Sequence, residues 1–367
     1  MTEGHGGPLA GLRVVEFAGI GPGPFACMLL SDLGADVVTV QRPGRQAVDS
    51  VLGRGRTIVE ANLKDVASRD AVLALVDRAD TIVEGFRPGV MERLGLGPAV
   101  LTARNPRLVY GRMTGWGQEG PLATTAGHDI DYIAITGALH AIGTADSGPV
   151  PPLNLVGDFG GGSLYLVMGL LVALLERERS GRGQVVDAAI VDGTLSLLSS
   201  TIAQRLAGRF EDRRASNRLD GGTPYYGVYA TADDRHVAVG PLEKAFFDEL
   251  CERLGLDDTW RDAHGDRSRW PALRAELART FATRSQAAWT ALLEGTDACY
   301  APVLPLGEAE GHPHLIARAA FIDVAGTRQP APAPRLSRTP GAVQGPAPSV
   351  ATPIDVVAAR WVAIDRR

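Results

Sequence analysis

Over its first 190 residues the chain alternates between two patterns of hydrophobic and polar positions. Short apolar runs with the length of a buried strand occur in the segments 12–17, 37–43, 81–86 and 105–117. Between these runs, apolar residues recur with helical spacing, as in residues 71–80 (AVLALVDRAD). Strands that alternate with helices pair in parallel, and helices cover both faces of the resulting sheet. The pattern therefore predicts an α/β fold built on a parallel sheet.

The second half of the chain has a different pattern. After a strand near residue 184 we expect a long helix, and then a polar stretch at 208–222 that suits a linker. Residues 225–240 (YYGVYATADDRHVAVG) contain two short alternating runs joined by a turn, which predicts a β-hairpin. Helical segments follow to about residue 295. The proline-rich residues 326–353 favour an extended strap over a helix or a central strand.

These patterns divide the chain into a large domain and a small domain of the α+β class. No internal repeat is visible. The predicted boundaries are a large domain at 1–186 that is completed by 330–367, a linker at 187–225, the small domain at 226–315 and a return linker at 316–330.

Composition narrows the classes of protein that fit the chain. The net charge is −5 and no basic block is present, so we expect no nucleic-acid partner. Cys27, Cys251 and Cys299 lie far apart without CxxC spacing, which is typical of buried thiols in a reducing compartment, here the cytoplasm. The N-terminus shows no signal-peptide pattern. The apolar run at 164–175 is too short to cross a bilayer, so we expect a buried helix and no membrane partner.

Residues 19–24 (GIGPGP) follow the first predicted strand and raise the question of a dinucleotide site. Their glycine spacing differs from the dinucleotide fingerprint, and Pro22 and Pro24 lack the N–H groups that a pyrophosphate would need. The second strand ends in Gln41 and Arg42 instead of the acidic residue that binds a ribose. We therefore exclude a dinucleotide site, and the basic residue suits a phosphate better.

Ionisable residues stand at three predicted helix openings. His128 and Asp129 begin a predicted helix at 128–139, Asp158 precedes three glycines and a very apolar helix, and Glu243 begins the helix after the hairpin. Each carboxylate has a plain structural interpretation, because acidic residues favour the first turn of a helix. The alternative is chemical. A histidine and a carboxylate beside free N–H donors can remove a proton next to a carbonyl and stabilise the oxyanion.

Two such bases on opposite faces of one carbon would take a proton from one face and return one to the other. This inverts a stereocentre with neither a metal ion nor a redox cofactor, so we expect no cofactor. The spacing alone leaves open whether His128 and Asp158 lie together in the fold.

Several motifs occur in an order that resembles one known family. The most specific are VVEFAGIGPGPFACMLLSDLGADVV near the N-terminus, AGHDIDYIAITGALHAIG around His128 and PPLNLVGDFGGG around Asp158. With further matching segments they extend over about residues 8–340, nearly the whole chain. The chain thus resembles the α-methylacyl-CoA racemases within the family III CoA-transferase (CaiB/BaiF-type) superfamily.

The resemblance implies a fold, an assembly and a set of roles. It implies a Rossmann-like large domain and an interlocked homodimer whose active site lies between the large domain of one subunit and the small domain of the other. His128 and Asp158 match the two bases of the racemases, and Glu243 matches an acid/base partner that supports them. The backbone N–H of Asp129 would bind the thioester oxygen. The residues expected to bind CoA or the substrate are Arg42, Ala61, Asn62, Leu63, Lys64, Arg93, Gly127, Asp129 and Tyr132.

The sequence departs from the family pattern at two places. Asp131 stands where the racemases have asparagine, and this extra charge would raise the pKa of His128 if the two side chains lay close. The substitution would alternatively mark an altered acyl preference. Residues 239–247 (VGPLEKAFF) also differ from the usual segment, so the part of the pocket formed by the small domain is expected to differ.

Three functions stay open. The expected one is an isomerase that interconverts (2R)- and (2S)-2-methylacyl-CoA by α-proton removal and return through an enolate, with CoA as part of the substrate. The alternative is a CoA transferase in which Asp129 is the nucleophile and forms an acyl anhydride. The third is a CoA-thioester binder without activity. The identity of the acyl group, the preferred direction of epimerisation and any residual transferase activity are not determined by the sequence.

Overall fold

The computed structural model describes residues 6–45 and 51–365 of the chain. These residues form two compact units. The first unit comprises the residues up to Thr136, Pro152–Ser199 and the residues from Arg318 on, and the second comprises Gly137–Pro151 and Ser200–Ala317. Each unit has its own hydrophobic core. The domain boundaries given by the sequence patterns stay predictions.

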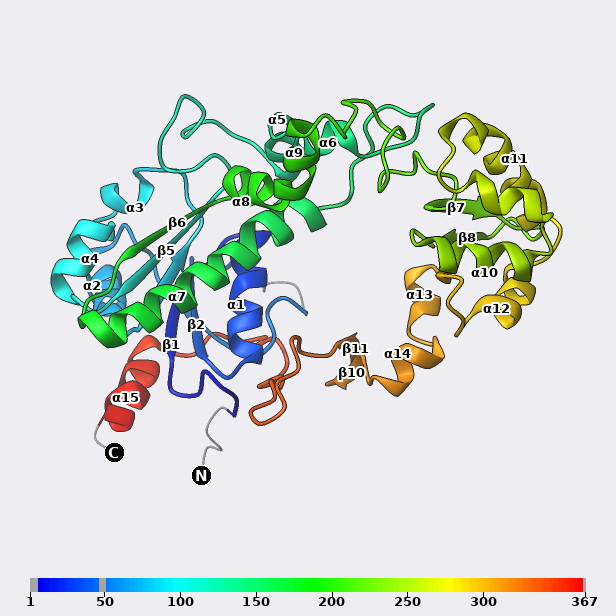
Figure 1. Ribbon diagram of the computed structural model, residues 1–367. Helices are drawn as coiled ribbons and strands as arrows, with labels where there is room; N and C mark the ends of the chain where they lie inside the picture. Colours follow the sequence, from blue (N-terminus) through cyan, green and yellow to red (C-terminus); the bar gives the residue numbers. More distant parts are fainter. Residues whose placement is uncertain (1–5, 46–50, 366–367) are drawn as a thin grey trace. The chain divides into compact units, whose positions relative to one another are not determined.

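The first unit is built on a parallel sheet of six strands within the described residues, in the order β3-β2-β1-β4-β5-β6 (Figure 1). The strands are β1 (Arg13–Phe17), β2 (Asp36–Gln41), β3 (Arg56–Glu60), β4 (Thr81–Glu84), β5 (Val109–Thr114) and β6 (Val185–Ala189). The predicted α/β fold with a parallel sheet is confirmed. The sequence patterns do not predict β3, because its apolar run is only Ile58 and Val59.

The order of the strands reverses at β1. The chain runs outward from β1 through β2 to β3, and then returns to β4 on the other side of β1. Val15 of β1 thereby lies between Val38 of β2 and Ile82 of β4. Ligands of open parallel sheets bind in the crevice at the carboxyl ends of the two strands where the order reverses. In this sheet those ends are Phe17 and Glu84.

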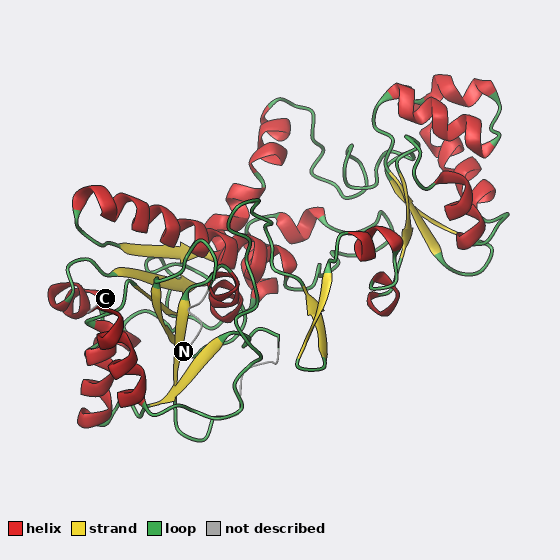
Figure 2. Cartoon of the chain, turned by 90° about the horizontal axis from the view of Figure 1, so that it is seen from below, coloured by secondary structure: helices red, strands yellow, loops and turns green. Residues whose placement is uncertain are grey.

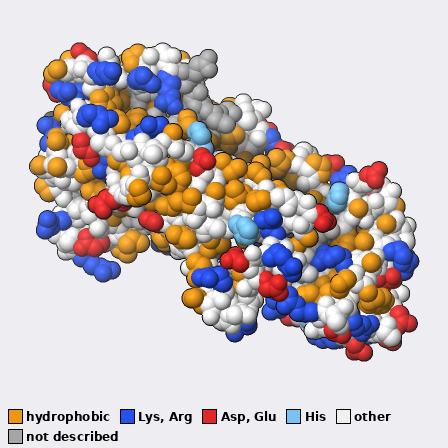
Figure 3. Space-filling model, turned by 90° about the horizontal axis from the view of Figure 1, so that it is seen from above, with side chains coloured by type: hydrophobic (Ala, Val, Ile, Leu, Met, Phe, Trp, Pro, Cys, Tyr) orange, Lys and Arg blue, Asp and Glu red, His pale blue; other side chains and the backbone are white. Residues whose placement is uncertain are grey.

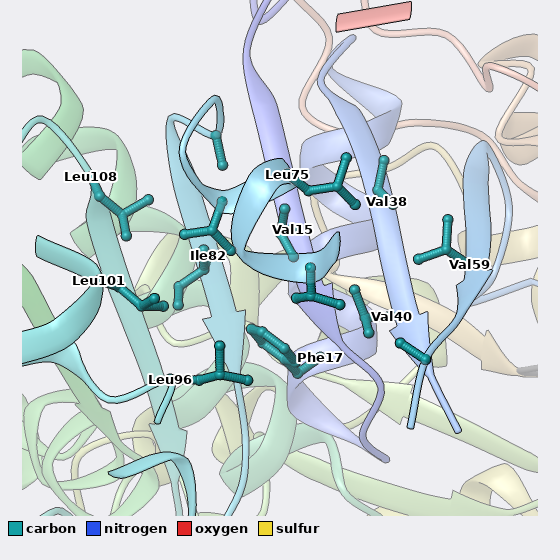
Figure 4. Packing of buried hydrophobic residues seen from close by; sticks show 14 of the residues in the cluster. Val15, Phe17, Val38, Val40, Val59, Leu75, Ile82, Leu96, Leu101 and Leu108 are labelled. Atoms are coloured by element: carbon teal, nitrogen blue, oxygen red, sulfur yellow. The ribbon is translucent and has the colours of Figure 1, made fainter. Parts of the chain in front are cut away.

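Helices cover both faces of the sheet, as the alternating pattern predicts. One face packs against α2 (Val66–Val76), α3 (Val90–Arg93), α4 (Pro98–Arg104) and α15 (Ile354–Asp365). Figure 4 shows this core, in which Leu75 of α2 lies next to Val15 and Val38 of the sheet. The other face packs against α1 (Pro22–Asp32) and α7 (Leu164–Ser180), through residues such as Leu30 and Leu170. Pro22 begins α1, at the first helical position, where proline is common.

Three helical predictions around the candidate residues need correction. The predicted helix at 128–139 ends sooner, because Gly137, with a φ of 86°, separates α5 (Asp129–Ile135) from α6 (Ala138–Ala141). Asp158 does not precede its helix but lies in the first turn of a π-helix, η1 (Leu155–Ser163), which continues into α7. The long helix predicted after the strand near residue 184 is two helices, α8 (Ile190–Leu197) and α9 (Ser199–Leu206).

The continuous helical segment Leu155–Ser180 is longer than the apolar run at 164–175 suggests. By length and composition alone it could cross a membrane, and 39% of its most apolar window is buried. The core helix of a soluble protein passes the same test, so this is weak evidence for a membrane span. The segment is also not buried all round. Leu164, Met168, Val172 and Leu175, an apolar stripe along one face of α7, are 52–60% exposed, and Figure 3 shows that hydrophobic side chains reach the surface between charged ones.

The second unit contains a three-stranded antiparallel sheet covered by helices (Figure 2). β7 (Gly227–Ala230) and β8 (His236–Val239) form the predicted hairpin, and β9 (Tyr300–Val303) pairs with β8. The helices of the unit, besides α6 and α9, are α10 (Lys244–Leu254), η2 (Asp258–Ala263), η3 (Arg267–Arg269), α11 (Trp270–Phe281), α12 (Gln286–Leu293), α13 (Leu306–Ala309) and α14 (Pro313–Ala317).

From residue 331 to residue 353 the C-terminal proline-rich segment contains neither a helix nor a strand, in agreement with the prediction that it forms neither. Its first residues, however, form β11 (Thr327–Pro330), which pairs in a hairpin with the preceding strand β10 (Phe321–Val324). Arg54, which is buried, ties this segment to α1. Its Nε donates to Asp32 Oδ1 at 3.0 Å, and its Nη1 donates to the carbonyl oxygen of Pro330 at 2.8 Å.

Candidate active site

A pocket of about 630 Å³ lies in the first unit where the strand order reverses. The carboxyl ends of β1, β4 and β5 form its floor, and the openings of α1 and α5 and the first turn of η1 border it. Pockets of this size hold small organic ligands. Its lining includes Phe17, Gly21, Arg45, Val83, Arg87, Met113, Trp116, Gly127, His128, Tyr132, Asp158 and Ile190. The two predicted bases, His128 and Asp158, therefore border one pocket.

His128 occupies the N-cap position of α5. Its backbone is extended, with a φ of −130°, so the residue leaves the helix and can turn its side chain toward the pocket. The carboxylate of Asp131 accepts the backbone N–H of His128 at 2.9 Å. Asp131, the departure from the family pattern, thus caps the helix that carries the candidate base. An asparagine oxygen could accept the same hydrogen bond.

Asp158 is half-buried between the opening of α5 and the glycine loop before α1. Asn154 donates its side-chain N–H to Asp158 Oδ2 at 3.4 Å. A Cβ at Gly21, where φ is 66°, would lie 3.0 Å from the same oxygen. The glycine loop, which does not fit a dinucleotide, therefore gives room to the candidate carboxylate.

Asp129 contacts the backbone of this same turn. Its Oδ1 accepts the N–H of Asp158 at 2.6 Å. A Cβ at Gly157 would lie only 2.3 Å from that oxygen, so the close approach of α5 to η1 requires a glycine there. The side chain of Asp129 is thereby in contact with the segment that carries Asp158.

The surroundings of Asp158 disfavour its charged form. Burial is the main cause that raises the pKa of Asp158, and the carboxylate of Asp129 adds to it, whereas the hydrogen bond from Asn154 and the imidazole of His128 lower it. Burial likewise raises the pKa of Asp129, against the hydrogen bonds from the backbone of Asp158 and Gly157. A carboxyl group with a raised pKa is closer to the pH at which a general acid or base works well.

Tyr132 fixes one wall of the pocket. Its ring lies so close to Gly115 and Gly127 that a Cβ at either position would overlap with it, and its hydroxyl donates to the carbonyl oxygen of Gly127. Trp116 packs edge-on against the ring, with the centroids 4.7 Å apart. The residue before His128 is thus held by an aromatic pair.

The remaining residues predicted to bind CoA lie outside the pocket lining. Arg42 follows β2, and Ala61–Lys64 follow β3, where the N–H of Ala61 donates to the carbonyl oxygen of Gln41. Arg93 is at the end of α3, after β4. Arg42, Lys64 and Arg93 are exposed. Because β2, β3 and β4 are parallel, these residues and the pocket stand at the same edge of the sheet.

Two basic residues of the pocket were missed in the sequence. Arg45 donates to the carbonyl oxygens of Ala18 and Gly19 at 2.8 and 2.7 Å, and so holds the start of the glycine loop. Arg87 lies in the loop after β4. The signal available in the sequence was their position just after two predicted strands, since loops at those ends of parallel strands form the binding crevice.

Glu243 belongs to the second unit, where it is the N-cap residue of α10. This agrees with its predicted place at a helix opening. Its predicted role toward His128 and Asp158 stays a prediction.

The described residues contain no group of three or more His, Cys, Asp or Glu side chains that could hold a metal ion. What the pocket offers is an imidazole, a carboxyl group with a raised pKa and two guanidinium groups. This set can exchange protons with a bound molecule and can bind an anionic one.

Comparisons with known proteins agree with this picture. The model of the CoA-transferase family III matches residues 9–352. Over 333 residues the chain is 44% identical to the α-methylacyl-CoA racemase of Mus musculus, covering 90% of this chain and 87% of that protein. It is 42% identical over 337 residues to the racemase of the same name from Homo sapiens, with the same coverage. The resemblance inferred from the motifs is confirmed.

A solved structure extends the agreement to the fold. The crystal structure of a CAIB/BAIF family protein from Brucella suis matches with a TM-score of 0.83 at 25% identity, covering 97% of this chain and 100% of that chain.

Proposed function

Because the chain belongs to the CoA-transferase family III, we propose that it is a racemase of 2-methylacyl-CoA thioesters. It interconverts the (2R) and (2S) forms by removing the α-proton on one face and returning a proton on the other. The observation that carries the proposal is that His128 and Asp158 border the same pocket. The identity of 42–44% to two proteins named α-methylacyl-CoA racemase supports the same reaction.

In this proposal each base acts on one enantiomer. The thioester carbonyl makes the α-hydrogen acidic, and one of the two groups removes it while the other, in its protonated form, stands ready to donate. The raised pKa of Asp158 favours this exchange of roles, because the protonated carboxyl is accessible nearer neutral pH. The reaction needs no net transfer of electrons, so His128, Asp158 and a donor for the enolate oxygen suffice.

The backbone N–H of Asp129 is the proposed donor to that oxygen. It lies at the first position of α5, where an N–H has no partner within the helix. An N–H aimed at a developing oxyanion stabilises the enolate more than the thioester. Glu243 keeps its predicted role as a supporting acid/base partner.

CoA is bound in this proposal at the carboxyl edge of the sheet. Arg42, Lys64 and Arg93 supply cations for its phosphates, and Ala61, Asn62 and Leu63 form the loop between them. Gly127 and Tyr132 line the pocket. Arg45 and Arg87, which line the pocket, add positive charge next to the thioester end.

The interlocked homodimer is also part of the proposal. The exposed apolar stripe on α7 supports an association with a second copy, because apolar side chains aligned along one helix face favour burial. A cytoplasmic location is proposed with it, on the basis of three free cysteines.

The direct test is α-hydrogen exchange. The enzyme is incubated with one enantiomer of a 2-methylacyl-CoA in D₂O, and the α-carbon is followed by NMR and by separation of the enantiomers. The proposal expects deuterium at the α-carbon together with inversion. If no deuterium enters, and CoA instead moves to an added free carboxylate, the chain is a transferase.

A further inference from the structure

Asp129 carries the carboxylate that matches the nucleophile of the transferases, yet this carboxylate contacts the protein backbone. Its Oδ1 accepts the N–H of Asp158 at 2.6 Å and lies against Gly157, where a Cβ would be only 2.3 Å away. Asp129 itself is not among the residues that line the pocket. The side chain therefore connects two elements, α5 and η1, which carry the two proposed bases.

We propose that the Asp129 carboxylate is a positioning group, which ties the first turn of η1 to the helix opening that carries His128 and so fixes the place of Asp158. This inference rests on the proposed function, because it concerns how that pair of bases is held.

The reason lies in the hydrogen bonds of a helix start. The first N–H groups of a helix have no acceptor within it. The first backbone hydrogen bond of η1 is donated by the N–H of Phe159 to the carbonyl oxygen of Asn154 at 3.2 Å. Asp158 comes just before it, and Asp129 supplies the acceptor for its N–H from another helix. A π-helical turn is rare and persists only where its surroundings hold it.

Close packing leaves this turn little freedom. A Cβ at Gly157 would lie 2.9 Å from the side chain of Ile133 of α5. On the other side, Gly161 packs against the backbone of α8, where a Cβ would lie 2.8 Å from the nitrogen of Thr194. The hydroxyl of Ser163 donates to the carbonyl oxygen of Pro22 at 2.8 Å. Asp129 thus completes a set of contacts from α1, α5 and α8.

The same contact opposes acyl transfer. An oxygen that accepts a backbone N–H bond has a lone pair engaged in that bond and is a weaker nucleophile, although burial raises the pKa of Asp129. Oδ1 could attack a thioester only by giving up its bond to the turn that carries Asp158, and Asp129 is not among the residues that line the pocket. The geometry therefore favours proton transfer over anhydride formation at this site.

The test compares Asp129→Asn with Asp129→Ala, and uses Glu119→Gln, an exposed carboxylate of the first unit, as the control. The asparagine keeps an oxygen acceptor, whereas the alanine removes it. We expect turnover in the racemase assay to fall by about 10²-fold in the alanine variant and by less than about tenfold in the asparagine variant, because a base displaced by about 1 Å costs about that much. KM for the acyl-CoA is expected to change less than kcat in both variants.

Two further readouts separate positioning from general damage. Amide hydrogen exchange at Asp158 should accelerate by about tenfold or more in Asp129→Ala and much less in Asp129→Asn, because the lost bond protects that amide. The acidic limb of kcat/KM should move to lower pH in Asp129→Asn, since removing the Asp129 charge lowers the pKa of Asp158. The other groups that act on Asp158, His128 and Asn154, are unchanged in this variant.

Three results would overturn the inference. One is an asparagine variant that is as inactive as the alanine variant but keeps the wild-type amide protection. This result would assign the loss of activity to the lost charge of Asp129. Another is an acyl adduct on the Asp129 peptide during turnover, seen by mass spectrometry. The third is unchanged amide exchange in Asp129→Ala. Failure of the proposed function is distinguishable from failure of this inference. If the proposed function is wrong, the wild-type protein incorporates no deuterium at the α-carbon. The amide exchange still tests whether Asp129 holds the turn.

Discussion

At the residue scale, the site depends on how each ionisable side chain is held and how far it is buried. His128 and Asp158 can be identified from the sequence, because each stands beside glycines and before an apolar helical pattern. Arg45 and Arg87 could not be identified in this way. Their residue type is common on surfaces, and only the arrangement of the sheet brings the loops after β2 and β4 to one pocket.

Glu84 gives a prediction on the pH dependence of stability. It lies next to the pocket at the end of β4, where its Oε2 accepts the N–H of Phe86 at 2.8 Å and its Oε1 pairs with Arg112 at 3.1 Å. Burial raises the pKa of Glu84 from 4.5 to about 7. Between pH 4.5 and about pH 7, Glu84 is protonated in the folded state and ionised in the unfolded state. The free energy of unfolding should therefore fall as the pH rises through this interval, by up to about 3 kcal/mol from this residue.

The variant Glu84→Gln removes this titration. Denaturant unfolding of the wild type and the variant across the same pH interval measures the difference. The stability of the variant should depend less steeply on pH. If the free energy of unfolding depends on pH in the same way in both proteins, the pKa of Glu84 is the same in the folded and unfolded states, and the prediction is wrong.

At the scale of the elements, the sequence predicts those whose pattern is strong and misses those set by tertiary contacts. The strands β1, β2, β4 and β5 follow from their apolar runs. The π-helix η1 does not, because its wide turn depends on Asp129 of α5 and on the close approach of α8. The break between α5 and α6 depends on the conformation of one glycine, Gly137, which a helical pattern can include.

The crossing of η1 and α8 should be intolerant of a methyl group. A Cβ at Gly193 would lie 1.8 Å from the carbonyl oxygen of Gly161. Gly193→Ala should therefore separate the two helices, lower the free energy of unfolding by about 1–3 kcal/mol or more, and reduce turnover, because η1 carries Asp158. Thermal unfolding together with the exchange assay checks both effects. Gly265→Ala, where a Cβ meets nothing within 4 Å, is the matched control and should leave both values unchanged.

The ion pair that ties α1 to the C-terminal segment should contribute strongly to stability. Arg54 and Asp32 are buried, with exposed side-chain fractions of 2% and 1%. Arg54→Met leaves Asp32 without its partner and should cost about 3–5 kcal/mol. Arg104→Met breaks the exposed pair with Asp77 and should cost less than about 1 kcal/mol. Chemical denaturation of both variants measures the contrast, and equal losses would contradict the assigned difference in burial.

At the scale of the whole molecule, the sequence predicts the fold class and the family, whereas the assembly stays a prediction. The pattern of apolar positions is sufficient for the fold class, since α/β layers follow from local periodicity. The same pattern does not predict which side chains of α7 are exposed. The run at 164–175 reads as uniformly apolar, and only the packing of the helix on the sheet shows which side chains, such as Val172, stay exposed.

The proposed homodimer predicts a mass in solution of twice the chain mass of 38.7 kDa. Val172→Glu places a charge in the apolar stripe of α7 and should shift the protein toward the monomer, because burying an unpaired carboxylate is costly. Sedimentation equilibrium measures the mass of the wild type and of the variant in solution. Val66→Glu, at an exposed valine that begins α2, is the control and should not change the mass. A monomeric wild type at micromolar concentration would contradict the assembly.

His128 and Asp158 are proposed to serve opposite faces of one carbon. The most direct measurement follows α-hydrogen exchange in D₂O separately from the pure (2R) and (2S) thioesters, with His128→Ala and Asp158→Asn. Both variants should lose interconversion by at least about 10²-fold. Each should keep measurable exchange from one enantiomer only, and the two variants should keep opposite enantiomers. Exchange retained from the same enantiomer in both variants would place the two groups on one face and contradict the account.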